Sequence, residues 1–248
     1  MIINSDINVL GSIKDYGIIS LLLNNNSDKV NYSGNIGYNF KTSKSFNRMR
    51  DALLSTVVKI DNPDYRDLIK VVFNNEGISD NLMMLLFWNS SHNNELLNYL
   101  NMNVFFPAYF SGRLILKNDE VVACLNDLKY SENQIKKWSH STVETTASKY
   151  LSLLKKFHLL EGRISKAIIH LFLSDQLFLY FIYWLKSIEN KSNILNSEWL
   201  VYSFMEKDFF IERTLKKKYR EFFEVQYSGD KLTILLLSNY HNIYNAKF

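Results

Sequence analysis

The chain has 248 residues, of which 47% are hydrophobic, and this composition excludes a wholly disordered protein. It contains eight glycines and two prolines, few for a fold that needs many tight turns, so long helices with short connections are favoured. The formal net charge of +4 indicates only a weak preference for polyanionic partners. The single cysteine, Cys124, excludes an internal disulfide and a multi-cysteine metal site, which suits the reducing cytoplasm.

The first residues, MIINSDINVLGSIKDYG, lack the basic-then-apolar order of a signal peptide, and no membrane partner is expected. One apolar segment, residues 167–185, is interrupted by polar side chains, including Asp175 near its centre. A central Asp costs several kcal/mol in lipid, and the uninterrupted part, residues 177–185, is too short to span a bilayer. We therefore expect a buried core helix here.

Helical patterns fill the N-terminal half. Residues 12–23 are expected to form a first helix, followed by a polar loop over residues 31–39. Ser43 or Ser45 is a candidate cap for a basic helix with an apolar stripe. Asn62 before Pro63 predicts the start of the next helix, and Ser79 predicts the start of an apolar core helix. A further helix is expected over residues 94–101.

The middle of the chain predicts a helix-turn-helix arrangement. A helix is expected over residues 119–129, and Ser131 with Gln134 is a capping-box pattern for a short helix ending near Trp138. Ser141 with Glu144 is a second capping box, opening a long helix with an apolar face. The connection between the two is only about three residues long, which is the helix-turn-helix layout. The exit FHLLEG, ending at Gly162, is typical of a winged helix.

The C-terminal region combines helix and hairpin signals. Leu215, Tyr219, Phe222 and Phe223 keep helical spacing, and alternation around the turn at residues 228–230 then predicts a small β-hairpin. The predicted fold class is all-α: a multi-helix globular fold with two helix-turn-helix-like units, at about 24–59 and 119–162, and this C-terminal hairpin. A soft boundary near Asn118 divides the chain into an N-terminal domain, residues 1–117, and a C-terminal domain, residues 118–248.

The outward face of the long helix is rich in hydroxyls and lysines, which meet base edges and phosphates. Its one carboxylate, Glu144, is expected to be occupied by capping. The alternative is an ordinary amphipathic helix packing a core. The groove-edge candidates are Ser141, Thr142, Thr145 and Thr146, and the phosphate candidates on this helix are Lys149 and Lys156.

A second basic site precedes the apolar stripe of the earlier helix. Its four phosphate candidates, Lys41, Lys44, Arg48 and Arg50, occupy ten residues without an acid and surround a helix start, where backbone N–H groups also attract phosphate. The alternative is a solvated helix face. A third cluster, residues 216–220, is flanked by glutamates, and a solvated face is the better interpretation there.

Signatures of catalysis are weak. The chain has no Gly-rich phosphate loop, no GxSxG and no HExxH, and its five histidines lack metal-ligand spacing. Asp175 with Glu189 and Lys191 resembles the acidic part of a restriction-type nuclease site, but that site needs strands and this segment reads as an aromatic helix. We therefore expect a protein that is not an enzyme and has no catalytic residue, metal or cofactor.

Two stretches resemble the BrxA family of bacteriophage exclusion (BREX) systems: WSHSTVETTASKYLSLLKKFHLLEG, residues 138–162, and TSKSFNRMRDALLSTVVK, residues 42–59. Family members share a W-S-x-S-T opening, an L-L-E/D-G-like exit and an early helix rich in Arg and Ser/Thr. The resemblance implies a non-enzymatic, helical protein that binds double-stranded DNA beside a methyltransferase and ATPase components. This chain has fewer arginines and more asparagines than many relatives, so base contacts of individual side chains are not carried over.

The leading hypothesis is therefore duplex DNA binding through phosphate neutralisation. The sequence shows no coiled-coil heptads, so we expect a monomer. Two rivals remain. A protein-interaction or scaffold subunit would use the same basic faces to meet acidic partners in a complex, and a helical RNA-binding bundle would also use basic helix starts.

Overall fold

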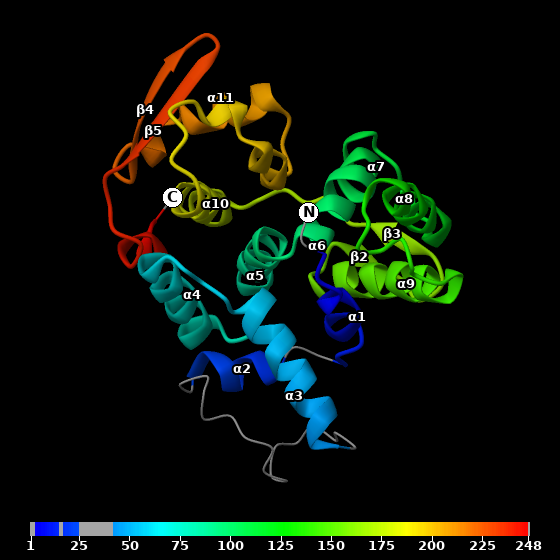
Figure 1. The fold of residues 1–248 in the computed structure, drawn as a ribbon. Coiled ribbons are helices and arrows are strands. Elements are labelled where there is room, and N and C mark those ends of the chain that lie inside the picture. Colours follow the sequence, from blue (N-terminus) through cyan, green and yellow to red (C-terminus); the bar gives the residue numbers. More distant parts are fainter. Residues whose placement is uncertain (1–2, 15–16, 25–41, 248) are drawn as a thin grey trace. The chain divides into compact units, whose positions relative to one another are not determined.

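The structure is a computed structural model that describes residues 3–14, 17–24 and 42–247. In this part of the chain helices dominate, and the strands form one three-stranded and one two-stranded antiparallel sheet (Figure 1). The two-stranded sheet is the predicted C-terminal hairpin. The predicted fold class, a mostly helical globular fold with a small hairpin, is confirmed.

The chain folds into two compact units that are interleaved in sequence. Unit 1 contains residues 1–59 and 86–170, and unit 2 contains residues 60–85 and 171–248. Helix α5, Asp80–Asn93, passes from one unit to the other, because its residues up to Leu85 belong to unit 2 and the remainder to unit 1. The boundary predicted between residues 117 and 118 falls inside unit 1.

Unit 1 is built from short N-terminal helices, the second part of α5, a helical run that continues from α6 to α7, and two longer helices beside a small sheet. Its elements are α1 (Asp6–Leu10), α2 (Gly17–Asn24), α3 (Ser43–Ala52), the π-helical turn η2 (Leu53–Val57), α6 (Glu95–Leu100), the π-helical turn η3 (Asn101–Phe105), α7 (Phe106–Phe110), β1 (Ile115–Leu116), α8 (Asn118–Ser131), α9 (His140–Lys156), β2 (Leu160–Glu161) and β3 (Lys166–Ile168).

The N-terminal helices begin at other residues than predicted. Residues 12–14 are not helical, and the chain instead forms α1 before them and α2 from Gly17. Helix α3 is capped by Thr42, whose hydroxyl oxygen accepts from the backbone N–H of Ser45 at 3.1 Å, so neither Ser43 nor Ser45 is the cap. Much of the first predicted helix-turn-helix-like unit, including residues 25–41, lies outside the described residues.

A buried polar chain joins α9 to the helices beneath it. Tyr150 of α9 donates its hydroxyl to the amide oxygen of Asn101 at 2.9 Å, and the Asn101 amide nitrogen donates to Ser91 at 3.0 Å. All three side chains are fully buried. A buried polar group without a partner costs free energy, so these bonds favour one rotation of α9 over others that would also bury apolar residues.

Unit 2 is assembled from two long helices, several short helical turns and the hairpin. Its elements are α4 (Pro63–Glu76), the first part of α5, α10 (Asp175–Ile188), the 3-10 helices η4 (Ile194–Asn196), η5 (Glu198–Ser203), η6 (Lys217–Tyr219) and η7 (Asn242–Asn245), α11 (Lys207–Thr214), β4 (Phe223–Ser228) and β5 (Lys231–Leu236).

Two start signals in and near unit 2 are confirmed. The side chain of Asn62 accepts from the backbone N–H of Tyr65 at 3.0 Å, and Pro63 occupies the first turn of α4. The hydroxyl of Ser79 accepts from the N–H of Leu82 at 3.2 Å, just before α5. Both depend on contacts within four residues, which is why the local pattern predicts them.

Helix α10 is the predicted buried aromatic helix, with residues 178–185 all buried. It begins at Asp175, because the preceding apolar residues form β3 and an extended connection. No helix in the described residues is long and apolar enough to cross a membrane.

The C-terminal helix prediction is wrong, and the hairpin prediction is confirmed. Around Tyr219 the chain forms only the 3-10 turn η6, and Phe223 begins β4. Strands β4 and β5 pair in a register that places Ser228 opposite Lys231. Gly229 in the turn between them has φ +69°, a conformation that glycine adopts without strain.

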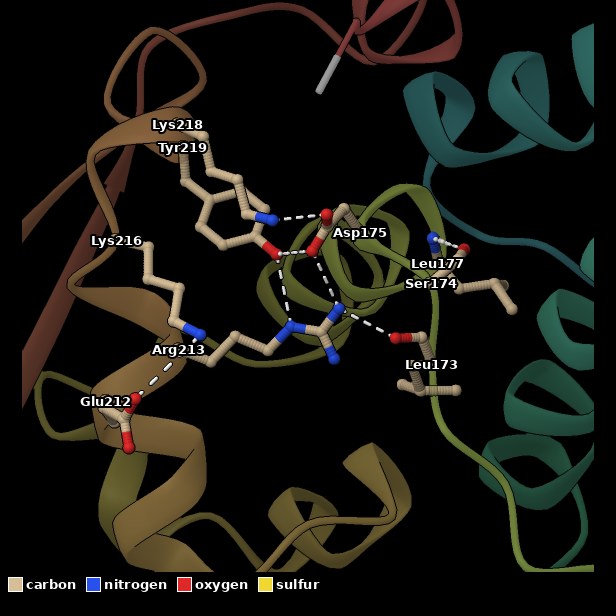
Figure 2. A network of polar contacts seen from close by, with 9 residues as sticks. All are labelled: Leu173, Ser174, Asp175, Leu177, Glu212, Arg213, Lys216, Lys218 and Tyr219. Atoms are coloured by element: carbon tan, nitrogen blue, oxygen red, sulfur yellow. Dashed lines mark hydrogen bonds and ion pairs between the residues drawn. The ribbon is translucent and has the colours of Figure 1, made fainter.

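A buried arginine anchors the start of α10 to the end of α11 (Figure 2). Arg213, whose side chain is 8% exposed, donates to the Asp175 carboxylate and the Leu173 carbonyl, at 3.0 and 2.7 Å. Tyr219 and Lys218 also donate to Asp175. Burial raises the pKa of the Asp175 carboxyl, but these hydrogen bonds outweigh it and hold the pKa at about 2.

We predict that Asp175→Asn lowers the free energy of unfolding by about 2–3 kcal/mol at neutral pH, because it leaves the Arg213 charge buried without its counter-ion. The depressed pKa means that this stabilisation is present above about pH 4 and is lost as pH falls toward 2. Urea unfolding of wild type and variant across this range should give curves that converge in acid. Asp208→Asn, at an exposed position in α11, is the control and should unfold like wild type.

Candidate nucleic-acid interface

Six elements of unit 1 follow one another in the order helix, strand, helix, helix, strand, strand. The helical run from α6 to α7 leads into β1, then α8 and α9, and then β2 and β3. The three strands form an antiparallel sheet in the order β1-β3-β2. Strands β2 and β3 of this sheet are labelled in Figure 1. We call the hairpin from Leu160 to Ile168, formed by β2 and β3 with residues 162–165 at its tip, the wing.

The segment between α8 and α9 differs from the predicted short helix. Residues 133–137 form consecutive turns, and the Gln134 side chain accepts from the backbone N–H of Ile3 at 2.8 Å instead of capping Ser131. Lys129 donates to the Trp138 carbonyl at 2.7 Å at the end of these turns. The helix-turn-helix arrangement is therefore α8, a turn segment and α9.

Ser139, and not Ser141, caps α9. Its hydroxyl accepts from the backbone N–H of Thr142 at 3.1 Å and is hydrogen-bonded to the Thr142 hydroxyl at 2.9 Å. Ser141 therefore lies inside the first turn of the helix. Glu144 is not occupied by capping; it is exposed, and its carboxylate lies 3.4 Å from the His140 imidazole nitrogen.

One face of α9 is open to solvent along its length. Its side chains are mostly hydroxyls at helical spacing, and the only carboxylate among them is Glu144. Ser152 is half-buried and the others are exposed. We call this set the α9 stripe: Ser141, Glu144, Thr145, Ser148, Ser152 and Lys155.

The groove-edge candidates divide between this stripe and the interior. Ser141 and Thr145 are exposed, and Thr142 is half-buried beside Ser139. Thr146 is fully buried and donates its hydroxyl to the Thr142 carbonyl at 2.9 Å, so its prediction as a groove-edge residue is wrong. Thr146 lies on the buried side because α9 packs against both α8 and α1.

Helix α1 covers the flank of α9 that carries two predicted phosphate contacts. Gly11 lies so close that a Cβ added there would be 2.3 Å from the Lys149 carbonyl oxygen. Lys149 is half-buried. Lys156 donates to the carbonyls of Leu10 and Gly11, at 3.0 and 2.7 Å, and thereby caps the end of α1. The Lys156 ammonium thus makes two hydrogen bonds at this helix end, and its assignment as a phosphate contact stays a prediction.

The second basic site is only partly available. Lys44 and Arg48 are exposed on α3, whereas Arg50 is half-buried and paired with Asp51 at 3.0 Å. Lys41 lies outside the described residues. A surface depression of about 680 Å³ beside Lys44 and Arg48 is also lined by the carboxylates of Asp6 and Asp51, so this surface is of mixed charge.

Several cations that the sequence analysis did not select lie in the turn segment before α9 and in or beside the three-stranded sheet. Lys136 and Lys137 are exposed in the turns before α9, and Arg163 is exposed on the wing. Lys166 is half-buried on β3, and Lys117 is exposed directly after β1, whose Leu116 pairs with Lys166. The winged-helix exit at FHLLEG was a signal for these wing residues, since a second strand is expected after such an exit.

Three acidic or nucleophilic features of the described residues bear on the weak signatures of catalysis. Among the described residues no three His, Cys, Asp or Glu side chains gather in a way that could hold a metal ion. Asp175 and Glu189 lie at opposite ends of α10, a 14-residue helix about 20 Å long. They are too far apart to share a cation, as the nuclease interpretation requires. Cys124 lines a depression of about 620 Å³ between α8 and the run from α6 to α7, and burial raises the pKa of its thiol.

The order of these elements, their sheet and the exposed face of the second helix define a winged helix-turn-helix protein. The BrxA family matches residues 35–182, more than half of the chain, and the chain belongs to this family. It is therefore a component of a BREX phage-defence system, as the resemblance of residues 42–59 and 138–162 implied. No curated protein and no solved structure matches the chain.

Lys156 should make the stability of unit 1 depend on pH. Burial, and then the neighbouring Lys149, lowers the pKa of Lys156 from 10.5 to about 8. Between about pH 8 and 10 the unfolded chain then binds more protons than the folded one, so stability rises with pH. We predict that Lys156→Met abolishes this rise, measured by urea unfolding at several pH values. Lys155→Met, at an exposed position, should keep it; an unchanged rise in Lys156→Met would contradict the assignment.

Proposed function

We propose that this BREX component is a non-catalytic, monomeric binder of double-stranded DNA that acts in the cytoplasm. In this proposal α9 enters the major groove with its stripe, and the turn segment before α9 and the wing lie against the phosphates. The observation that carries the proposal is the α9 stripe itself, a hydroxyl-rich helix face with cations at both ends and the single carboxylate Glu144. A helix face that meets only solvent usually carries many acidic side chains among its basic side chains.

The chemistry of the stripe favours modest sequence readout. Hydroxyls of Ser141, Thr145 and Ser148 can donate to or accept from several base edges. The stripe contains no Arg, Asn or Gln, the side chains that make bidentate contacts with guanine or adenine. Its small side chains instead permit a close approach of the helix to the groove floor. Affinity would then come mainly from phosphate neutralisation and depend steeply on salt.

The phosphate contacts are proposed at the two ends of the stripe. At the first end, exposed Lys136 and Lys137 precede the helix start, where free backbone N–H groups add to the attraction for phosphate. At the second end lie Lys155 and Arg163, both exposed. Lys155 donates one hydrogen bond to the Gly162 carbonyl at 3.0 Å, and its ammonium has further donors for a phosphate. Lys44 and Arg48 of α3 are additional candidates.

A role in binding other defence components is the second candidate function, and a feature of unit 2 favours it. The outer face of the hairpin exposes Leu235 and Leu237, with exposed fractions of 61% and 55%, and Leu215 beside it is 44% exposed. Exposed apolar side chains that cluster in this way favour contact with a partner protein. Such contact and DNA binding would use different units of the chain.

We predict that Lys136→Gln and Lys137→Gln each weaken binding to all duplex sequences alike and reduce the slope of log affinity against log salt by about 0.9, the value for one lost phosphate contact. Fluorescence anisotropy of a labelled duplex at several salt concentrations measures both quantities. Lys207→Gln, at an exposed position of α11 in unit 2, is the matched control and should leave both unchanged.

Competition experiments separate the rival functions. Single-stranded DNA and RNA should compete poorly if the duplex is the ligand, and strong competition by single-stranded RNA would favour the RNA-binding alternative. If the wild-type protein fails to bind duplex even at low salt, DNA binding is refuted. Partner capture that Leu235→Asp abolishes would then favour the protein-interaction role.

A further inference from the structure

The tip of the wing carries an apolar side chain that is almost fully exposed. Ile164 is 95% exposed, the largest exposed fraction among the large hydrophobic residues described in the chain. The next residue on one side is the exposed Arg163, and on the other Ser165. A single exposed isoleucine needs no explanation by itself. Its position at the tip of a braced hairpin, beside the proposed duplex-binding helix, is what gives it significance.

The wing holds this side chain in a defined place. Gly162 turns the chain with φ +85°, and a Cβ at this position would lie 2.2 Å from the Ser165 carbonyl oxygen, so the turn is tight. Lys155 of α9 donates to the Gly162 carbonyl at 3.0 Å, and Lys166 donates to the Arg163 carbonyl at 2.8 Å. Both bonds restrain the backbone just before Ile164, so less conformational entropy would be lost there when the tip binds.

The surroundings of Ile164 are cationic. Arg163 is adjacent, Lys166 lies on β3 of the wing itself, Lys155 of α9 bonds to Gly162, and Lys117 directly follows β1, the strand paired with β3. The acids nearest to these cations in sequence are Glu161, at the base of the hairpin, and Asp119 and Glu120, in the first turn of α8. An apolar tip with cations on neighbouring elements matches one ligand well, a duplex whose phosphates line both sides of a groove while stacked apolar bases lie between them.

We propose that Ile164 inserts between two base pairs from the minor groove and kinks the duplex, while Arg163 lies along the groove wall. This inference rests on the proposed duplex binding by α9. Unstacking is easiest at pyrimidine–purine steps such as TA, so the wing would favour sites with such a step at a set distance from the helix, without reading base edges. The wing would thus supply a selectivity that the hydroxyls of the α9 stripe lack.

The test uses the full-length protein and AT-rich duplexes that carry 2-aminopurine at TA steps, together with duplexes labelled at both ends for energy transfer. Wild type should increase 2-aminopurine fluorescence, because the base is unstacked, and should increase energy transfer, because the duplex is bent. Ile164→Ala should lose both increases while still binding. Ile164→Phe, which keeps an apolar wedge, should retain them.

Controls distinguish this inference from the function on which it depends. Phe209→Ala removes an exposed apolar side chain from unit 2 and should behave as wild type. If wild type binds no duplex, the proposed function fails, and the proposed insertion of Ile164 as a wedge fails with it. If wild type binds but neither signal rises, or if Ile164→Ala keeps both increases, only the wedge is overturned. Binding to anionic lipid vesicles that depends on Ile164, without any DNA signal, would also overturn it.

Discussion

The hydrogen bond from Tyr150 to Asn101 is the constraint on which the candidate interface depends. Helix α9 buries one arc of apolar residues, and burial of such an arc sets the rotation of the helix about its axis only approximately. A buried phenol that must reach a buried amide, itself bonded to Ser91, strongly favours one rotation. Given that rotation, Ser141 and Thr145 face solvent, and Thr146 is enclosed and bonds to the helix backbone.

Helix α1 then limits the surface of α9 that a ligand can contact. The close contact at Gly11 and the bonds from Lys156 to the end of α1 occupy one flank, so the exposed surface is a stripe and not a broad basic face. The cations available for phosphates are therefore those at the ends of the stripe. In the proposed binding mode the protein would contact the DNA backbone at two places and present small side chains between them, which favours affinity over sequence readout.

Because the chain belongs to the BrxA family, this surface is part of a component of a BREX phage-defence system. The two units have different surfaces. Unit 1 carries the winged helix and the proposed DNA contacts, whereas unit 2 is anchored internally by Arg213 and Asp175 and exposes leucines on its hairpin. The two proposed surfaces, one for duplex DNA and one for a partner protein, belong to different units of this chain.

Features that depend on neighbours within a few residues were determined by the sequence itself: the Asn62 cap, the buried helix α10, the turn at Gly229 and the helix-turn-helix order around α9. Local patterns failed where partners are distant or compete. The predicted cap of α9 was Ser141, whereas Ser139, two residues earlier, accepts from the Thr142 N–H, so the local pattern placed the helix start slightly too late. The two hydrogen bonds of Lys156 gave no local signal, because the carbonyls that accept them lie 145 and 146 residues away. The wing cations came together only through strand pairing, because short strands carry little local signal and their register is decided by the core beneath them.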